Sequence, residues 1–371
     1  MRRELERVEI PGEHEARTRA RAVVLVAFSE REPTPHRRSR RPVAALAAAV
    51  VVVAGLLSPP GRAVLGELRA AVGVERAQPA LFSLPAPGRL LVSSDSGAWI
   101  VDPDGSKRLL GDYREASWSP FGRFVVAARR NELAALEPDG GVRWTVSRQD
   151  VRSPRWTGSP ADTRIAYVDR LGLRVVAGDG RRDRLLAPAE GGALAWRPGP
   201  GFELAYVSAS EVRLQDVETG GVRWRANAGR LPAARALSWS ADGSRLLVVL
   251  SDRLLLLDGR GRELARRTVH GILTAALSPD GGRVALARRT EIVLLDDRLR
   301  GPRRVFAGGG RLEGLTWSQD GRWVLTGWPA ADQWVFVRVT RGEPRIVAVS
   351  NVSAQFRSGT FPRVEGWCCA G

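Results

Sequence analysis

A repeat of about 40 residues is the feature of this sequence that most constrains its fold. A short apolar segment ending in a large side chain recurs at Trp118, Trp156, Trp196, Trp239, Leu277 and Trp317. The intervals between these positions are 38, 40, 43, 38 and 40 residues. A degenerate further copy begins at Ala80, about one period before Trp118. Seven copies at a nearly fixed period indicate an array in which each copy is one structural unit.

Each copy contains four short segments that are typical of strands. In the last copy these segments are residues 315–317, 322–328, 333–339 and 344–350, with a Ser-Gln-Asp-Gly turn after the first. Such runs are rich in Val, Leu and Trp, which favours strands over helices. Four-stranded units of this length, repeated about seven times, build a β-propeller. We therefore predict an all-β fold, a seven-bladed β-propeller over residues 80–356, with six or eight blades as alternatives.

A Ser-x-Asp-Gly turn follows the large residue in several copies. The Asp carboxylate can accept hydrogen bonds from nearby backbone amides, and the Gly adopts a positive φ without steric cost. The preceding Trp is large enough to fill the gap between adjacent sheets. We interpret the following repeat residues as structural: Trp118, Trp156, Trp196, Trp239, Trp317, Asp242, Gly243, Asp280, Gly281, Asp320 and Gly321.

The motif Trp-Ser-x-Asp-Gly, at 239–243 and 317–321, resembles the repeat of WD-repeat-like propellers, which also forms the propeller domain of TolB-like proteins. The resemblance covers residues 80–350 and implies a bacterial propeller. True WD repeats also carry Gly-His and Trp-Asp pairs, whereas the only histidine in this region is His270 and no Trp-Asp pair occurs.

A second motif, Gly-Gly-Val-Arg-Trp, occurs twice and ends at Trp144 and Trp224. It resembles the repeats of quinoprotein propellers, in which the Trp docks between blades. We interpret both Trp residues as packing residues. The motif nevertheless keeps open an alternative function, that of a propeller enzyme such as a quinoprotein-like oxidoreductase or a hydrolase.

The part of the chain before the repeats has a different character. Residues 1–42 are polar and basic, and the uncharged apolar run 43–57 follows a cluster of arginines at 36–42. As a helix this run spans about 22 Å, against about 30 Å for a bilayer core. Arginine beside an apolar run favours a membrane anchor with a cytoplasmic N-terminus. A buried core helix and a signal-peptide apolar region are the competing interpretations.

These patterns give a predicted domain organisation. We expect a basic cytoplasmic segment at 1–42, a single-pass transmembrane helix at 43–58 and a linker helix at 59–79. The propeller at 80–356 would lie outside the cell membrane. Residues 357–371 would form a solvent-exposed tail that contains Cys368 and Cys369. The two cysteines are adjacent, which is neither a disulfide framework nor a metal-ligand spacing, and a strained bridge between the two neighbours stays an alternative.

Composition and motifs give little support for catalysis or nucleic-acid binding. The formal net charge is +17, and all but one of the 57 basic residues are arginines scattered along the chain. Only His270 could serve as a general base within the repeats, and no nucleophile elbow, phosphate loop or metal-ligand cluster accompanies it. We therefore expect a non-enzymatic binding or sensor module without a cofactor.

The last copy breaks the repeat with an extended loop, and such a deviation is where a binding surface is first sought. Within residues 327–336 we predict Trp328, Asp332 and Trp334 as a recognition surface. The expected partners are a protein or cell-envelope ligand for the propeller and the membrane for the anchor. For residues 1–42 we expect a cytoplasmic regulator such as a sigma factor.

Overall fold

The computed structural model describes residues 74–78, 83–188, 193–208, 211–227 and 234–369. The predicted cytoplasmic segment 1–42 and transmembrane helix 43–58 lie outside these residues. Within the described ranges, no helix combines the length and the apolar character that crossing a membrane requires.

The described residues form 29 strands and three short helical turns. The strands are β1 (Val74–Gln78), β2 (Arg89–Ser94), β3 (Gly97–Val101), β4 (Lys107–Gly111), β5 (Glu115–Trp118), β6 (Val125–Arg129), β7 (Glu132–Leu136), β8 (Val142–Ser147), β9 (Arg152–Gly158), β10 (Thr163–Val168), β11 (Gly172–Ala177), β12 (Arg184–Pro188), β13 (Leu194–Trp196), β14 (Glu203–Ser208), β15 (Glu211–Asp216), β16 (Val222–Asn227), β17 (Ala236–Trp239), β18 (Arg245–Val249), β19 (Arg253–Asp258), β20 (Glu263–Thr268), β21 (Ile272–Leu277), β22 (Arg283–Arg288), β23 (Glu291–Asp296), β24 (Arg303–Ala307), β25 (Glu313–Trp317), β26 (Trp323–Trp328), β27 (Gln333–Arg338), β28 (Arg345–Ser350) and β29 (Arg363–Cys368). The helical turns are η2 (Pro120–Gly122), η3 (Pro329–Ala331) and α4 (Val352–Gln355).

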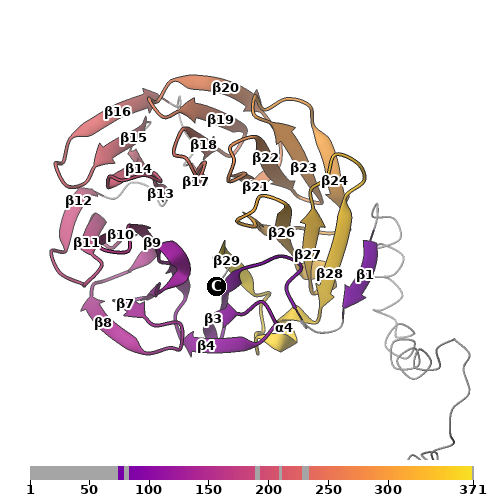
Figure 1. The fold of residues 1–371 in the computed structure, drawn as a ribbon, viewed down its shortest axis with the longest axis horizontal. Helices are drawn as coiled ribbons and strands as arrows, with labels where there is room; N and C mark the ends of the chain where they lie inside the picture. Colours follow the sequence, from indigo (N-terminus) through magenta and orange to yellow (C-terminus); the bar gives the residue numbers. More distant parts are fainter. Residues whose placement is uncertain (1–73, 79–82, 189–192, 209–210, 228–233, 370–371) are drawn as a thin grey trace, which may run out of the picture. The chain divides into compact units, whose positions relative to one another are not determined.

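These strands form seven sheets that are the blades of a propeller, antiparallel throughout except where β1 joins the edge of one sheet (Figure 1). Blade 1 is β2–β4 with β29, blades 2 to 6 are β5–β8, β9–β12, β13–β16, β17–β20 and β21–β24, and blade 7 is β25–β28 with β1. The inner strands contact one another in sequence around the ring, from β29 through β5, β9, β13, β17 and β21 to β25 and back to β29. The prediction of an all-β, seven-bladed propeller is therefore confirmed.

The hydrophobic core lies between adjacent blades rather than at one centre. One cluster joins Ala205 and Leu214 of blade 4 to Leu246 and Val248 of blade 5, all fully buried. The other clusters join neighbouring blades in the same way. This arrangement explains the continuous apolar runs of the middle strands, because both faces of each sheet are covered by a neighbouring sheet.

Ring closure uses a strand from the far end of the chain. β29 pairs antiparallel with β2, with Arg89 opposite Cys368, and Trp367 of β29 is buried in the core between blades 1 and 7. Residues 363–368 were predicted to lie in a solvent-exposed tail, and the structure places them in blade 1 instead. The cause is backbone pairing, since the inner edge of β2 offers donors and acceptors that only a further strand can satisfy.

The outer edge of blade 7 also receives an additional strand. β1 pairs parallel with β28, with Val74 opposite Ile346. Residues 74–78 were predicted as the end of a linker helix at 59–79, but they form a strand because the unpaired edge of β28 provides hydrogen-bond partners. The rest of that predicted helix lies outside the described ranges.

Candidate functional site

The large residues that mark the repeat are packed between blades. Trp118, Trp156, Trp196, Trp239 and Trp317 lie on inner strands and are 6–9% exposed. The indole Nε1 of Trp196 donates to the carbonyl of Arg155 at 2.9 Å, and that of Trp317 donates to the carbonyl of Ala276 at 3.0 Å. Because each acceptor belongs to the inner strand of the preceding blade, these indoles connect adjacent blades.

The aspartates of the repeat organise turns. Asp242 accepts from the hydroxyl of Ser240 at 2.6 Å and from the amide of Ser244 at 3.0 Å. These hydrogen bonds, led by the one from Ser240, lower the pKa of Asp242 to about 2. Asp280 and Asp320 each accept from a Ser hydroxyl at 2.5 Å. Gly243, Gly281 and Gly321 follow with φ values of 66°, 69° and 64°.

The predicted recognition residues do not form an exposed surface. Trp328 and Trp334 are both fully buried. The indole of Trp328 donates to the carbonyl of Gly309 at 2.8 Å, and the ring of Trp334 lies 5.2 Å from that of Phe356. Burial therefore assigns both indoles to packing, although the loop does deviate from the repeat.

Asp332, the third predicted recognition residue, holds the short helix α4 in place. Its carboxylate accepts from the amide of Ser353 at 2.9 Å and from the hydroxyl of Ser353 at 2.7 Å. Its own φ of 50° lies in the left-handed region. These contacts give Asp332 a structural role at the junction of β27 and α4.

The other motifs found in the sequence are also accounted for by packing. The indoles of Trp144 and Trp224 donate to the carbonyls of Gly178 and Gly259, at 2.9 and 3.1 Å, in the next blade. His270 is exposed, and its carbonyl accepts from the Nε of Arg288 at 3.2 Å. Among the described residues, no cluster of three or more His, Cys, Asp or Glu side chains could hold a metal ion.

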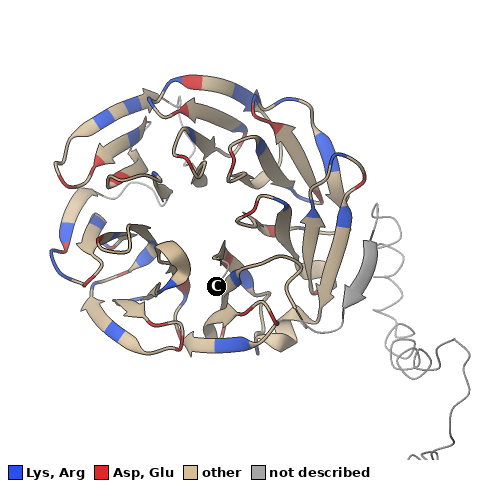
Figure 2. Ribbon diagram, in the orientation of Figure 1, with Lys and Arg blue, Asp and Glu red and all other residues tan. Residues whose placement is uncertain are grey.

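A basic groove of about 510 Å³ lies between blades 5 and 6. Its walls come from the start of β18, from β20 and from the turn between β23 and β24. Five arginines line it, with Asp297 as the one acidic residue: Arg245, Arg266, Arg267, Arg298 and Arg300. Figure 2 shows that basic residues are spread around the propeller with acidic residues between them. Five arginines against one aspartate therefore distinguish this groove from the mixed charge of the surrounding blades.

Three of these arginines are held by the protein itself. Arg245 donates through Nη1 to Asp297 at 3.1 Å, and Arg267 donates to the carbonyl of Leu299 at 2.9 Å. Arg266 forms an ion pair of 2.7 Å with Glu263. These contacts fix the shape of the groove and leave part of each guanidinium available.

The remaining two arginines, Arg298 and Arg300, are exposed at the groove. Within the described part of the chain, no hydrogen bond or ion pair engages either guanidinium. Their backbone amides donate to Asp296 at 2.9 and 2.7 Å, which fixes the turn that carries them. Guanidinium groups bind carboxylates through paired hydrogen bonds, so this turn presents two ready donors for an anion.

The groove also contains an apolar side chain. Leu264 is 48% exposed, although it is a large hydrophobic residue. It precedes Arg266 by two positions on β20, so both lie on the same face of the strand. An apolar contact beside several guanidiniums suits a peptide with acidic and hydrophobic residues better than a simple ion.

Sequence reasoning missed this groove because its arginines are far apart in the chain. Arg266 and Arg298 are separated by most of one repeat, and in the sequence they belong to an apparently uniform scatter of arginines. The period of the repeat provides the signal that could have found them, since outer strands and turns of successive copies become neighbours in a propeller.

Comparison with known proteins identifies the fold of this chain and assigns it to no family. No family model and no curated protein matches the chain. Among solved structures, the C-terminal WD40 domain of Sif2 is similar with a TM-score of 0.57 and 14% identity, over 76% of this chain and 90% of that one. Hydrazine synthase of Kuenenia stuttgartiensis matches with a TM-score of 0.49 and 12% identity, over 71% and 80%. The chain is a β-propeller with a WD40-like structural neighbour.

Proposed function

We propose that this chain is a non-enzymatic binding propeller whose basic groove between blades 5 and 6 holds an acidic segment of a partner protein. The observation that carries the proposal is the pair Arg298 and Arg300, which are exposed and lie on a hydrogen-bonded turn, and whose guanidiniums form no hydrogen bond or ion pair with other described residues. WD40-like propellers commonly bind proteins, which is consistent with this role.

The electrostatics of the groove favour an acidic ligand over a neutral one. Five arginines face one aspartate there, and Asp297 is already paired with Arg245. Clefts lined by one sign of charge concentrate the oppositely charged partner and speed its association. Leu264 adds an apolar contact, so the expected ligand is a segment in which Asp or Glu alternates with a hydrophobic residue.

The test is binding of a labelled peptide of alternating Glu and Leu to the full chain, followed by fluorescence anisotropy. The double variant Arg298→Glu, Arg300→Glu reverses the charge of both side chains. It should weaken binding of the peptide by roughly tenfold or more, since two charge-assisted hydrogen bonds are replaced by repulsion. A peptide with Gln in place of Glu serves as the neutral comparison and should bind weakly.

The matched control is Arg181→Glu with Arg182→Glu, which reverses two arginines in the corresponding turn of blade 3. These changes alter the net charge by the same amount and should leave binding almost unchanged. Equal losses in the two double variants would show a general charge effect and contradict the proposal. Binding of a phosphate-rich polymer without binding of the peptide would also contradict it.

We further propose that the propeller is a bacterial, TolB-like module anchored to the cell membrane by residues 43–58, with residues 1–42 in the cytoplasm and the propeller outside. The uncharged run next to the arginine cluster supports this topology. Protease treatment of intact cells should digest the propeller. Full protection of the propeller, with digestion only after lysis, would exclude an external location.

In this topology, residues 1–42 would contact a cytoplasmic regulator such as a sigma factor. Their basic and polar character supports an interaction segment rather than a packed core. The full chain in detergent should retain such a regulator in a pull-down, and a chain lacking residues 1–42 should lose it. Equal recovery by both chains would assign the contact elsewhere.

A further inference from the structure

The turn of blade 2 lacks the aspartate that the Ser-x-Asp-Gly turns of blades 5, 6 and 7 share. Blade 2 has Ser119, Pro120, Phe121 and Gly122 where blade 5 has a Ser-Ala-Asp-Gly turn. Phe121 therefore takes the place of an aspartate that would bind its own turn. It has a φ of 66°, in the left-handed region that bulky residues rarely adopt, and its side chain is 61% exposed. A phenyl ring cannot form the hydrogen bonds of an aspartate, and this ring is not buried, so neither interaction offsets the energetic cost of the backbone conformation. This makes Phe121 a candidate contact residue.

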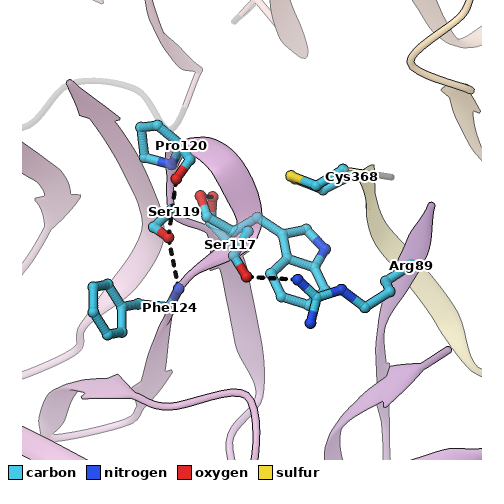
Figure 3. Close-up of a disulfide and its surroundings, with 9 residues drawn as sticks. Arg89, Ser117, Ser119, Pro120, Phe124 and Cys368 are labelled. Carbon is cyan, nitrogen blue, oxygen red and sulfur yellow. Dashed lines mark hydrogen bonds between the residues drawn. A yellow bond between two sulfur atoms is a disulfide. The ribbon is translucent and has the colours of Figure 1, made fainter. Parts of the chain in front are cut away.

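The turn that carries Phe121 lies against a pair of cysteines at the closure of the propeller. A disulfide joins Cys368 and Cys369 at the end of β29. A Cβ added at Gly122 would lie 2.9 Å from the Sγ of Cys369 and 2.8 Å from Nη2 of Arg89. The Sγ of Cys369 and the guanidinium of Arg89 thus both lie against Gly122. Figure 3 shows Arg89 and Cys368 beside the segment that runs from Ser117 to Phe124.

A disulfide between adjacent residues does little to stabilise a fold. The entropic contribution of a disulfide grows with the number of residues in the loop that it closes, and this one encloses none. β29 is already held by its ladder to β2 and by the buried Trp367. The cysteine pair is therefore better explained by its chemistry than by a role as a structural link.

We propose that Cys368 and Cys369 form a redox-active pair that exchanges with the dithiol of a partner protein, which makes apolar contact with Phe121. The two sulfurs differ in access, because Cys368 is half-buried and Cys369 is 8% exposed. A thiolate of the partner attacks Sγ of Cys368, forming a mixed disulfide and breaking the Cys368–Cys369 bond. Cys369 leaves as the thiolate.

The second thiol of the partner then completes the exchange. Its thiolate attacks the partner's own sulfur in the mixed disulfide, and Cys368 is released as a thiolate. The partner ends as a disulfide, and both cysteines of this chain take up one proton each. Two electrons pass from the partner to this chain, and the reverse sequence oxidises the pair.

Arg89 is placed to stabilise the leaving thiolate of Cys369. Its Nη2 donates to the carbonyl of Gly122 at 2.6 Å, and its guanidinium lies 4.8 Å from the ring of Trp118. Its Nε is buried and has no hydrogen-bond partner among the described residues. The cation is thus fixed beside Cys369 with bonding capacity left, and a positive group next to a thiolate favours exchange at that site.

The first experiment measures whether the pair changes redox state. The full chain is equilibrated in glutathione buffers of graded potential, its thiols are alkylated, and the C-terminal peptide is weighed by mass spectrometry. We expect a two-electron transition from an unalkylated to a doubly alkylated peptide. A two-cysteine protein reductase whose second cysteine is replaced by Ser should form a mixed disulfide with Cys368. Permanent double alkylation, or a mixed disulfide at Cys369, would overturn the proposal.

The second experiment compares the rate of reduction by the intact protein reductase with the rate for dithiothreitol. Phe121→Asp, which introduces the aspartate found in the turns of blades 5, 6 and 7, should slow reduction by the protein reductase by roughly threefold or more and leave reduction by dithiothreitol unaffected. Leu171→Asp is the matched control, because Leu171 is 62% exposed on blade 3, and it should change neither rate. Equal rates for Phe121→Asp and the unchanged chain would remove Phe121 from the site.

The role of Arg89 is tested with the same two reductants. Arg89→Gln should slow both by roughly threefold to tenfold, because the leaving thiolate loses its neighbouring cation, and Arg89→Lys should restore most of the rate. Circular dichroism checks that each variant is folded. If Arg89→Gln does not fold, Arg89→Lys and the mapping of the mixed disulfide still decide between the outcomes. A folded Arg89→Gln that reacts at the unchanged rate would contradict the role of the guanidinium.

Discussion

Blades 3 and 5 have the same strands but different chemistry at equivalent buried positions. In blade 5, Val248 pairs with Leu255 across β18 and β19, and both are almost fully buried. In blade 3, the corresponding cross-strand pair is Tyr167 and Arg174, on β10 and β11. Tyr167 is fully buried, and the side chain of Arg174 is 11% exposed. One backbone unit therefore accommodates either an aliphatic or a charged interior.

The charged interior of blade 3 is centred on Asp183. Its carboxylate accepts from the hydroxyl of Tyr167 at 2.9 Å and from Nε and Nη2 of Arg174 at 3.1 and 3.2 Å. Arg148 pairs with the same carboxylate. Asp169, also buried, accepts from two backbone amides and lies 3.7 Å from Nε of Arg174.

The difference shows what the repeat specifies and what it leaves open. Strand length, turn position and the large residue on the inner strand recur in both blades, and these determine the backbone. The side chains in the interior of a blade need only pack well or have hydrogen-bond and ion-pair partners. Aliphatic residues meet this condition by packing, and buried charges meet it only when every polar atom has a partner. Blade 3 should therefore be the more fragile of the two to single substitutions.

Asp183→Ala should have the largest effect on stability. It leaves Arg174 buried without its main partner, and we expect a loss of about 3–5 kcal/mol in the free energy of unfolding. Urea unfolding of the full chain, followed by tryptophan fluorescence, measures this loss. The control is Asp179→Ala, four residues earlier, whose carboxylate is 60% exposed and should contribute less than about 1 kcal/mol. Similar losses in both variants would contradict the network as described.

Converting the interior of blade 3 to that of blade 5 should recover most of this loss. The triple variant Tyr167→Val, Arg174→Leu and Asp183→Leu removes the buried Arg174–Asp183 ion pair as a unit, while Asp169 keeps the two backbone amides that donate to it. Its stability should lie within about 2 kcal/mol of the unchanged chain. Arg148 then loses its partner, but its side chain is 36% exposed and can be hydrated. A triple variant that is less stable than Asp183→Ala would show that the network determines the fold of blade 3, not only its interior.

The sequence predicted the backbone well because local signals recur in it. Trp239 and the turn at Asp242 and Gly243 indicate one hairpin. The recurrence of this pattern along the chain indicates the propeller. The features that were missed depend on contacts between distant segments. Asp183 belongs to a charged turn that reads as solvated in the sequence, and only the fold shows Arg148 and Arg174 beside it.

The candidate sites show the same limit. The repeat was correctly followed to the deviation at Trp328 and Trp334, but a deviation in the chain does not reveal whether a side chain is exposed. A second deviation, Phe121, replaces a turn aspartate and does reach the surface. β29 was not predicted because a single strand lacks the four-strand pattern of a full copy, and its partner β2 lies far away in the sequence, with Ser93 opposite Arg363.

Tyr167→Phe should have a smaller effect, and one that depends on pH. Removing the hydroxyl costs a hydrogen bond to a charged group, about 1.5–3 kcal/mol near neutral pH. Burial, with a further contribution from the hydrogen bond to Asp183, raises the pKa of Tyr167 above its ordinary value of 10.0. The neutral form is thus favoured in the folded chain, and this contribution to stability is present below pH 10 and is lost as the pH rises further.

The measurement is urea unfolding between pH 8 and pH 11 in both chains. The unchanged chain should lose stability above pH 10 more steeply than Tyr167→Phe, so that the difference between them narrows. Some loss should remain in the variant, because burial also raises the pKa of Tyr113. Parallel curves would show that Tyr167 does not account for the alkaline loss.

The smallest effect should come from the turn of blade 5, where polar interactions lie at the surface instead of in the core. Hydrogen bonds from Ser240 and Ser244 lower the pKa of Asp242 to about 2, against an ordinary value of 3.8. A lowered pKa stabilises the folded chain above about pH 4, and this contribution is lost as the pH falls toward 2. Because the carboxylate is exposed, its share should be less than about 1 kcal/mol.

Ser240→Ala tests this turn directly, because it removes the leading hydrogen bond and keeps the carboxylate. Titration of the Asp242 side-chain carbon by NMR should give a midpoint closer to 3.8 in the variant than in the unchanged chain. Ser244→Ala, which removes a contact of 2.8 Å at the exposed side of the same carboxylate, should move the midpoint less. If Ser244→Ala shifts the midpoint more, the buried hydroxyl of Ser240 is not the main hydrogen-bond donor to Asp242. The turn is then stabilised mainly by the exposed hydroxyl of Ser244.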